Sequence, residues 1–501
     1  MSQLDPTHPS LAPIGSFRAD LPLDDIRRAD AVRIRSLATW AAIKLTPGFL
    51  FLRQRSEFIQ GWQAAAAAGA ALSSGASAGA VGVPGMPALD SWMMLPNLTD
   101  ERTQTILPMN DSLYGAAQVE LDRLGPVVIG VPESLPDRRY WSIALLDAFM
   151  NNFAHLGPKW TGYDAGEYLL VGPDWDAAVP SWAAGVLRSP TVSVCLYNRV
   201  LVGYAPGDLD VVREWRQGIT LTTLVQRDGG AAPRVETADL VHGDLRSLVD
   251  PYRFLRLGFE HVDRNPPPTE DQWLVEFLRD ALEFGESDEL RAAVADGVED
   301  AQLILNGQIS GTPRRDGWTV PFDHVAEQGP YVLEQAVTQV RAIGSNDAAE
   351  AIYQFADRDA DGEPLDGANE NVYELRFASA PPLDDPGFWS VTIYGPDNLL
   401  VANPINRFST RISRPGFVLG DDGSATVVIA HRLPQDVPEA NWLPVPRGPF
   451  QVGLRLYYPS DAIREGTWFP PPVRRLHLRD SRACDPETER DSAFGSPAGR
   501  T

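Results

Sequence analysis

Two groups of polar side chains stand at the ends of apolar, strand-like runs, and their residue types could carry acid–base chemistry. Asn110 and Asp111 lie in PMNDSLYG, just before one run. Asp147, Asn151 and Asn152 lie in LLDAFMNNFAHLG, at the end of another. Two carboxylates in one pocket can divide the roles of acid and base, one protonated and one ionised. The structural alternative is that these side chains bind neighbouring backbone amides and fix the shape of a loop.

A fixed positive charge in a third polar segment, NPINRFS, could complete such a site. Arg407 is always protonated, and its planar guanidinium can fork onto a carboxylate with two parallel hydrogen bonds. Placed opposite Asp111 or Asp147, it would either clamp an acidic substrate or tie two parts of the fold together. We take Asp111, Asp147 and Arg407 as the candidate catalytic residues. Arg455, which alternates with apolar neighbours along a strand, and Arg199 could join the same network.

The expected pocket also needs side chains that bind a substrate. Segments with these polar runs supply the candidates: Asn110, Tyr114, Asn151, Asn152, His155, Asn406 and Trp442. Trp389 and Tyr394 could add to an apolar wall, although aromatic residues of a β-sandwich usually belong to its core. His155 could act as a general base, and the alternative is a hydrogen-bonded core histidine.

One acidic segment, DRDADG, has the spacing of the first half of a calcium loop. Asp357, Asp359, Asp361 and Gly362 match positions one, three, five and six of such a loop, but Ala368 stands where a bidentate glutamate is needed. An acidic turn is therefore favoured over a calcium site. The histidines show no H-E-x-x-H spacing, and no nucleotide-binding glycine motif follows a strand. No organic cofactor is predicted.

The composition is that of a folded, acidic protein. The 501 residues carry a formal net charge of −24, spread along the chain, which repels nucleic acids and anionic membrane surfaces. The expected partner is a small molecule, with homo-oligomerisation left open. The two cysteines, Cys195 and Cys484, form neither a disulfide framework nor a metal motif. The first residues lack the pattern of a signal peptide, so a cytoplasmic location is expected.

Changes in the hydrophobic pattern divide the chain into five regions and predict a multidomain α and β fold. A helical N-terminal region over 1–100 contains an uncharged Ala/Gly-rich stretch, 64–88, which we expect to be covered rather than to span a membrane. The helix before this stretch should place Val32, Leu37, Trp40 and Ile43 on one face. The other regions are a β-sandwich over 101–207, a helical domain over 208–345, a second β-sandwich over 346–476 and a disordered tail over 477–501.

Two of the predicted strands resemble each other. RYWSIALLDA (139–148) and GFWSVTIYGP (387–396) both begin with a short run that contains aromatic–Trp–Ser, and both continue with apolar residues up to a turn. An internal duplication would produce this similarity. Chance similarity between two buried strands would also produce it, and the two strings alone leave both explanations open.

Longer strings resemble a known bacterial family. NDSLY, LLDAFMNNFAHLG and YLLVGPDW are similar to the domain of unknown function numbered 1254. Further on, FWSVTIYG, NPINRFS, NWLPVPRGPF, LRLYYP and GTWFPPPV are similar to its usual partner, the domain numbered 1214. The resemblance implies an immunoglobulin-like β-sandwich, a helical middle domain and a jelly-roll-like β-sandwich. It implies no chemistry.

Two functions from different classes remain. The first is a cofactor-independent enzyme, a hydrolase or hydro-lyase, acting by acid–base chemistry on a small, partly apolar molecule between the two sandwiches. The second is a non-catalytic binding or scaffold protein, in which the same polar residues tie the domains together. A deep cavity holding a carboxylate of raised pKa would favour the enzyme, whereas polar groups that saturate one another would favour the scaffold.

Overall fold

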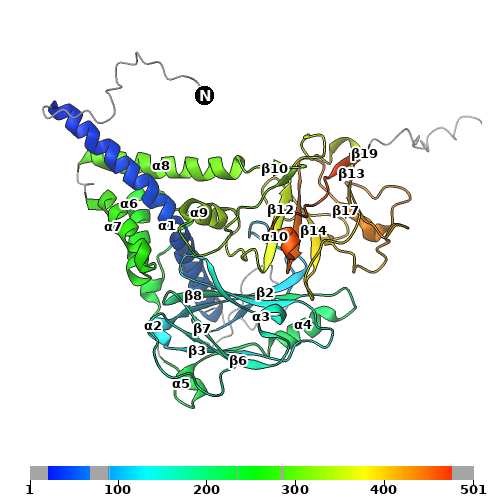
Figure 1. The fold of residues 1–501 in the computed structure, drawn as a ribbon, viewed down its shortest axis with the longest axis horizontal. Helices are drawn as coiled ribbons and strands as arrows, with labels where there is room; N and C mark the ends of the chain where they lie inside the picture. Colours follow the sequence, from blue (N-terminus) through cyan, green and yellow to red (C-terminus); the bar gives the residue numbers. More distant parts are fainter. Residues whose placement is uncertain (1–20, 68–88, 90, 234, 284–286, 477–501) are drawn as a thin grey trace, which may run out of the picture.

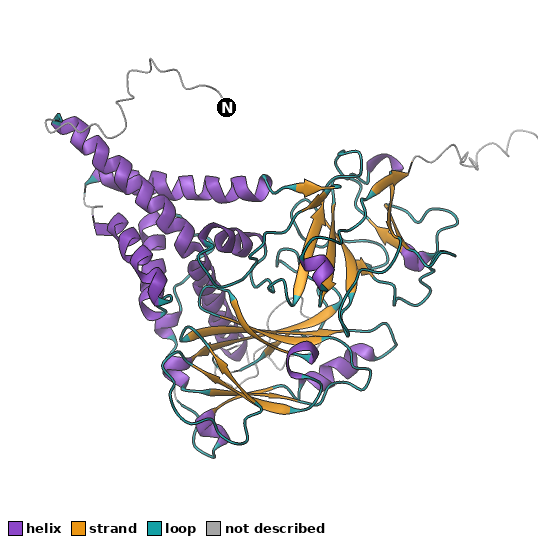
Figure 2. Cartoon of the chain, in the orientation of Figure 1, coloured by secondary structure: helices purple, strands orange, loops and turns teal. Residues whose placement is uncertain are grey.

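The fold is described by a computed structural model that covers residues 21–67, 89, 91–233, 235–283 and 287–476. Helices lie at the left of Figure 1, the first β-sandwich lies below and the second lies at the right. Figure 2 shows the same division by element type, and the expected combination of α and β domains is confirmed. No helix in the described ranges is long and apolar enough to cross a bilayer. Most of the stretch 64–88, Cys484 and the expected tail lie outside the described residues.

The first sandwich has two sheets whose facing sides form an apolar core. One sheet has the order β1 (Met93–Met94), β2 (Ser112–Glu120), β8 (Ser193–Leu201), β4 (Trp141–Leu146) and β5 (Asn152–Leu156). The other has the order β7 (Gly185–Arg188), β6 (Gly166–Val171), β3 (Val127–Val131) and β9 (Thr220–Thr223). Because side chains alternate along a strand, Val194, Leu196 and Val200 of β8 enter this core, while their neighbours face away from it.

The second sandwich is built in the same way. One sheet has the order β10 (Arg314–Arg315), β11 (Trp318–Thr319), β12 (Ala351–Ala356), β18 (Gln451–Tyr457), β14 (Trp389–Tyr394) and β15 (Ser409–Thr410). The other has the order β17 (Trp442–Pro444), β16 (Ala425–Ala430), β13 (Val372–Phe377) and β19 (Arg474–Leu476). Val452, Leu454 and Leu456 of β18 enter the core of this sandwich.

The two sandwiches share one topology. Strands β1 to β9 of the first have the same neighbours as strands β11 to β19 of the second, taken in chain order. The pairs β6–β7 and β16–β17 are parallel, and the other pairs in this set are antiparallel in both sandwiches. The similar strings noted in the sequence are β4 and β14, which occupy equivalent places. This agreement indicates an internal duplication rather than chance similarity.

Four strands lie outside the ranges expected for the sandwiches. β1 falls inside the expected helical N-terminal region and pairs with β2, and β9 falls inside the expected helical domain and pairs with β3. β10 and β11 precede residue 346 and join the second sandwich through β12. Strands of two to four residues carry too little alternation to be recognised in the sequence. The short helices are α2 (Leu121–Leu124), α3 (Pro158–Thr161), α4 (Asp208–Arg216), α5 (Leu224–Arg227), α10 (Asp461–Arg464) and the 3-10 turns Ala238–Leu240, Ala368–Glu370 and Glu439–Asn441.

The long helices form a bundle around α1 (Leu23–Ala67). It packs against α6 (Pro251–Arg264), α7 (Thr269–Glu283), α8 (Asp288–Ser310) and α9 (Val332–Arg341). The expected common face of α1 was wrong in part, because the side chains of Val32 and Trp40 are 58% and 49% exposed. The buried face includes Ala38, Ala41 and Ala42, whose small side chains let the neighbouring helices approach closely.

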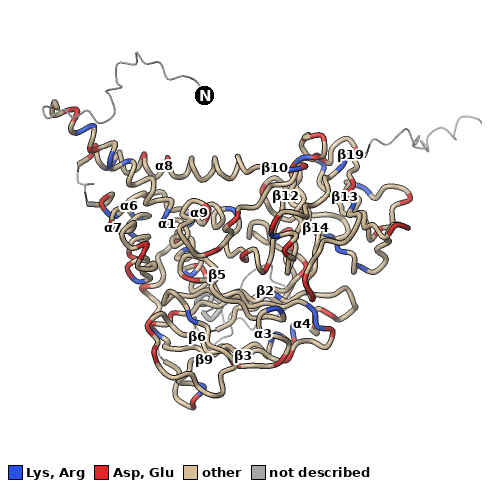
Figure 3. The backbone as a smooth tube through the Cα atoms, viewed as in Figure 1, with Lys and Arg blue, Asp and Glu red and all other residues tan. Residues whose placement is uncertain are grey.

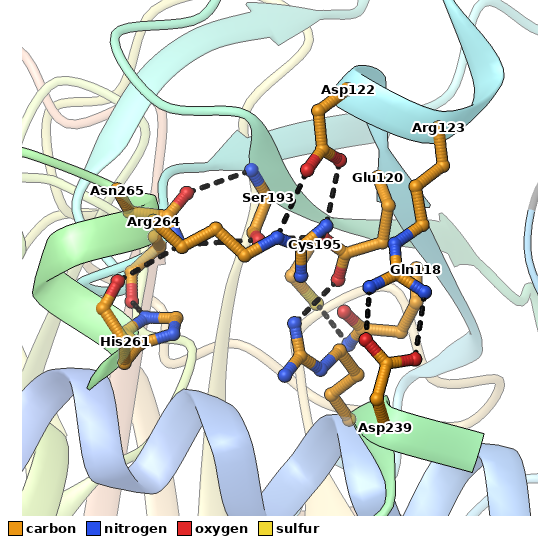
Figure 4. Close-up of polar contacts among 12 residues, drawn as sticks. Gln118, Glu120, Asp122, Arg123, Ser193, Cys195, Asp239, His261, Arg264 and Asn265 are labelled. Carbon is orange, nitrogen blue, oxygen red and sulfur yellow. Dashed lines mark hydrogen bonds and ion pairs between the residues drawn. The ribbon is translucent and has the colours of Figure 1, made fainter. Parts of the chain in front are cut away.

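A buried ionic network joins this bundle to the first sandwich. Glu120, at the end of β2, is fully buried and lies 2.7 Å from the guanidiniums of both Arg55 in α1 and Arg264 in α6. Ser193 donates to the same carboxylate at 2.6 Å. Figure 4 shows Arg264 and Ser193 converging on Glu120, with Asn265 bound to Ser193 beside them. The helices are therefore fixed to the sheet that also borders the candidate site.

Replacing Glu120 should loosen this attachment. Glu120→Gln removes the charge shared by the buried guanidinium of Arg55 and the partly exposed guanidinium of Arg264. Breaking a buried pair such as Glu120–Arg55 lowers the free energy of unfolding by about 3–5 kcal/mol. Asp239→Asn is the matched control, because the partner of Arg123 is 64% exposed and should contribute about 1 kcal/mol or less. Urea unfolding of both variants tests the difference. Equal, small losses would show that the Glu120 network does not hold the bundle in place.

Candidate functional site

A cavity of about 280 Å³ lies between the two sandwiches. It opens where the outer face of the β2–β8 sheet meets the outer face of the β12–β18 sheet. Strand alternation turns Tyr197 and Arg199 of β8 toward it from one side, and Arg455 and Tyr457 of β18 from the other. We call it the central cavity. Its polar and aromatic lining consists of Gln54, Tyr114, Tyr197, Arg199, Tyr353, Phe355, Arg455 and Tyr457, together with parts of the segments 103–108 and 342–345.

The duplication places one guanidinium on each side of the central cavity, in the same setting. In the first sandwich, Tyr114, Arg199 and Ser142 stand side by side across β2, β8 and β4. In the second sandwich, Tyr353, Arg455 and Ser390 stand side by side across β12, β18 and β14. We call these the two Tyr–Arg–Ser rows. The match in register extends the shared topology to individual side chains.

Arg199 is 5% exposed and is bound by uncharged groups. Its Nη1 atom donates to the side-chain oxygen of Asn346 at 3.0 Å, and Nη2 donates to the carbonyl of Gly344 at 2.9 Å. The rings of Tyr114 and Tyr197 lie 5.6 and 5.4 Å from its Cζ atom, within the range of cation–π attraction. Among the described residues, no carboxylate forms an ion pair with Arg199.

Arg455 is 3% exposed and has the same kind of surroundings. Its Nη2 atom donates to the carbonyl of Leu107 at 2.7 Å, and Nη1 donates to the hydroxyl of Thr392 at 3.3 Å. Leu107 adopts φ +51°, a left-handed conformation that is costly for leucine. The next carbonyl, of Pro108, accepts from the hydroxyl of Tyr394 at 2.7 Å. No described carboxylate pairs with Arg455 either.

The central cavity therefore contains two positive charges that the described residues do not balance. Burial lowers the pKa of Arg199 and of Arg455, nearby phenols raise it, and the net pKa lies above the ordinary value in both. Burial also raises the pKa of Tyr353, and it raises that of Tyr394 to about 12, so these phenols are neutral donors near pH 7. A buried charge is unfavourable until an opposite charge compensates it. The arrangement suits an anion.

Carboxylates near this interface are engaged elsewhere. Glu350 is fully buried and accepts from the hydroxyl of Tyr140 at 2.5 Å and the indole of Trp160 at 2.6 Å. In the segment DRDADG, Asp357 pairs with Arg314 at 2.9 Å, and Asp359 accepts two backbone N–H groups of its own turn. Within the described ranges, no group of three or more His, Cys, Asp and Glu residues could hold a metal ion.

The structure does not bring Asp111 and Asp147 together. Asp111 precedes β2 and Asp147 follows β4, and both strands run antiparallel to β8, which lies between them. The start of β2 therefore pairs with Leu201, whereas the end of β4 pairs with Cys195, six residues away. At ~3.3 Å per residue, the two carboxylates stand on the order of 20 Å apart along the sheet. The predicted convergence on one pocket was wrong.

Asp111 ties the two sandwiches to each other. Its Oδ1 atom accepts from the hydroxyl of Ser409 at 3.0 Å and lies 3.9 Å from the guanidinium of Arg411. The segments NDSLY and NPINRFS thus do meet across the interface. Asn110 donates to the carbonyl of Thr99. None of Asn110, Asp111 and Ser409 lines the central cavity.

Asp147 has a local role and a raised pKa. Burial is the cause of the raised pKa, although backbone N–H groups of Asn151 and Phe149 and the amide of Gln328 stabilise the carboxylate. Asn152 donates to the carbonyl of Ser345 at 2.8 Å. These contacts attach the end of the first sheet to the segment before β12, and neither Asp147 nor Asn152 lines the central cavity.

The remaining expected site residues are dispersed. Arg407 does not face Asp111 or Asp147; it pairs with Glu439 at 2.7 Å and binds backbone carbonyls. Asn406 is exposed and left-handed, with φ +48°, and Trp442 packs in an apolar cluster on the far sheet of the second sandwich. His155 lies 2.9 Å from Asp347 and stacks on Trp160 in a separate, open pocket. Of the expected set, Tyr114 is the one that lines the central cavity.

Among the described residues, Arg199 and Arg455 are the two charged residues that line the central cavity, although the sequence suggests only an accessory role for them. The signal that could have identified them is a single arginine at an inward position of an otherwise apolar strand. Both VSVCLYNRVL and QVGLRLYYP show this pattern. A strand that is apolar on both faces is covered on both, so a charge within it is buried.

Comparisons with known families agree with the division of the chain into two sandwiches. Residues 90–223 match the family described as protein of unknown function DUF1254, and residues 350–461 match the family described as protein of unknown function DUF1214. The chain carries a DUF1254 domain followed by a DUF1214 domain. The first match runs from β1 to β9 and the second from β12 to β18, so each corresponds to one sandwich. A comparison with curated proteins gave no match.

A solved structure shows a similar overall fold. The crystal structure of the VPA0106 protein from Vibrio parahaemolyticus is similar over 89% of this chain and 100% of that chain, with a TM-score of 0.63 and 19% identity. At that identity the likeness concerns the fold alone. An uncharacterised protein from Burkholderia cenocepacia shows a weaker likeness, with a TM-score of 0.41 and 15% identity over 92% of this chain and 91% of that one.

Asp111→Asn should destabilise the protein. The amide removes the charge 3.9 Å from buried Arg411, and an uncompensated buried cation lowers the free energy of unfolding by about 3 kcal/mol. Ser409→Ala, which removes only the hydrogen bond, should lower it by about 1 kcal/mol. Urea unfolding measures both losses. A fully stable Asp111→Asn variant would argue against the tie between the sandwiches.

Proposed function

We propose that the central cavity binds a small, partly apolar organic anion. The observation that carries this proposal is the pair of buried guanidiniums, Arg199 and Arg455, without an ion-pair partner among the described residues. Acidic residues outnumber basic ones in the chain, 67 to 43, and Figure 3 shows both kinds distributed over the helices and the two sandwiches. Two cations that face a cavity, with no described acid paired to either, depart from that pattern, and an anionic ligand would balance them.

The apolar part of the lining favours a ligand with a hydrocarbon portion. Met93, Leu95, Ile106, Ile343 and Phe355 border the same space as the guanidiniums. Binding sites of this kind combine a mostly apolar wall with a few polar groups that fix orientation. At roughly 30 Å³ for each water-sized unit, the cavity volume corresponds to on the order of ten non-hydrogen atoms.

Turnover of the ligand is a second candidate function, and Tyr114 favours it. Its hydroxyl makes no hydrogen bond within the described chain, and the guanidinium of Arg199 lies over its ring. A phenol hydroxyl beside a cation can donate a proton or a hydrogen bond to a negative charge that develops during a reaction. A hydrolase or hydro-lyase without an organic cofactor would then use Tyr114 and Arg199 in place of Asp111 and Asp147. The scaffold alternative treats both arginines as ties to backbone carbonyls.

Hexanoate and hexanamide provide a direct test of anion binding. Hexanoate should raise the melting temperature of the wild-type protein, because a ligand at a hundredfold excess over its Kd stabilises the folded state by about 2.7 kcal/mol. Hexanamide has the same shape without the charge and should have little effect. The double variant Arg199→Met/Arg455→Met should lose the response to hexanoate. Arg376→Met is the control, because it removes an exposed guanidinium that pairs with Asp422.

Equal responses to hexanoate and hexanamide would contradict the proposed function, as would an undiminished response of the double variant. The scaffold alternative predicts a third pattern. The double variant would then melt at a lower temperature than the wild type, and neither ligand would stabilise either protein.

A further inference from the structure

The two Tyr–Arg–Ser rows present the same donor group to the central cavity twice. Arg199 stands beside Tyr114 across β2 and β8, and Arg455 stands beside Tyr353 across β12 and β18. All four side chains line the one cavity. Duplication of a sandwich that binds one acidic group would give a site for two such groups, one on each side of the space between the copies.

Each guanidinium retains free donors for a ligand. A guanidinium has five N–H donors. Arg199 makes two hydrogen bonds, to Asn346 and Gly344. Arg455 makes two, to Thr392 and Leu107, and also interacts with the hydroxyl of Tyr394. The remaining N–H groups are enough for a carboxylate to bind at each guanidinium, where charge-assisted hydrogen bonds are the strongest kind.

The charge of the cavity decides how many acidic groups the ligand carries. A monoanion would compensate one guanidinium and leave the other buried without a counter-charge, which is unfavourable. A ligand with two acidic ends compensates both. Apolar side chains such as Ile106, Ile343 and Phe355 line the same cavity, which suits an uncharged spacer between the two ends.

We infer that the ligand of the central cavity is a small dicarboxylate, with one carboxylate bound by Arg199, the other by Arg455 and an apolar spacer between them. This inference rests on the proposed anion-binding function and narrows it to one substrate class. The number of carboxylates, rather than charge alone, then determines the affinity.

Isothermal titration calorimetry with matched acids tests the inference. Straight-chain dicarboxylates from succinate to suberate are compared, each with the monocarboxylate of the same number of carbons. One dicarboxylate length should bind the wild-type protein at least tenfold more tightly than its monocarboxylate. Either single variant, Arg199→Met or Arg455→Met, should reduce that dicarboxylate to the affinity of the monocarboxylate. Arg199→Lys and Arg455→Lys keep the charge and should retain a preference, and Arg376→Met should leave all affinities unchanged.

The outcomes separate the inference from the proposed function. If monocarboxylates and dicarboxylates bind the wild type equally well, the dicarboxylate inference fails while anion binding stands. If the preference survives in Arg199→Met or in Arg455→Met, one guanidinium is not used and the inference fails in the same way. If no acid of either kind binds, the proposed function fails together with the inference.

Discussion

Two guanidiniums buried between stacked sheets, with no described carboxylate to balance them, are the constraint on which the rest of this structure depends. Each sandwich has an ordinary apolar core, so Arg199 and Arg455 lie on the opposite, outer faces of the central strands. Those outer faces meet. Backbone carbonyls of the connecting segments accept hydrogen bonds from the two guanidiniums, at the positions where acidic side chains would be expected. Leu107 adopts a left-handed conformation, and its carbonyl accepts a hydrogen bond from Arg455. The carbonyl of Gly344 accepts a hydrogen bond from Arg199. Neutral hydrogen bonds position the cations without balancing their charge.

The surrounding elements hold this interface at a fixed spacing. The Asp111–Ser409 hydrogen bond joins the two sandwiches at one end of the first sheet, and the contacts of Asn152 with the segment before β12 join them at the other. The Glu120 network fixes α1 to the same sheet, and Gln54 of that helix borders the central cavity. Asp111 and the segment around Asp147 therefore help to set the spacing between the two sandwiches, and in the proposed function the two Tyr–Arg–Ser rows bind the ligand.

The fold was more predictable from sequence than the site was. Strand alternation, turn residues and the family strings located both sandwiches and the helical domain, because those signals are local. Whether distant residues meet in one site is not a local property. A residue before β2 and a residue after β4 lie at opposite ends of one sheet, because both strands run antiparallel to β8 between them. Tyr114 lines the central cavity because it lies within a strand that borders it, and its role there stays a prediction. The burial of Arg199 and Arg455 in one cavity depends on two sheets that face each other, and no local sequence pattern encodes that arrangement.

A crystal structure of the full chain grown with the tightest-binding dicarboxylate tests the central claim most directly. The account predicts density for one ligand in the central cavity, with a carboxylate within hydrogen-bonding distance of Arg199 and the other within hydrogen-bonding distance of Arg455. A carboxylate of the protein itself bound to either guanidinium would contradict the account. So would an ordered ligand that leaves both arginines untouched.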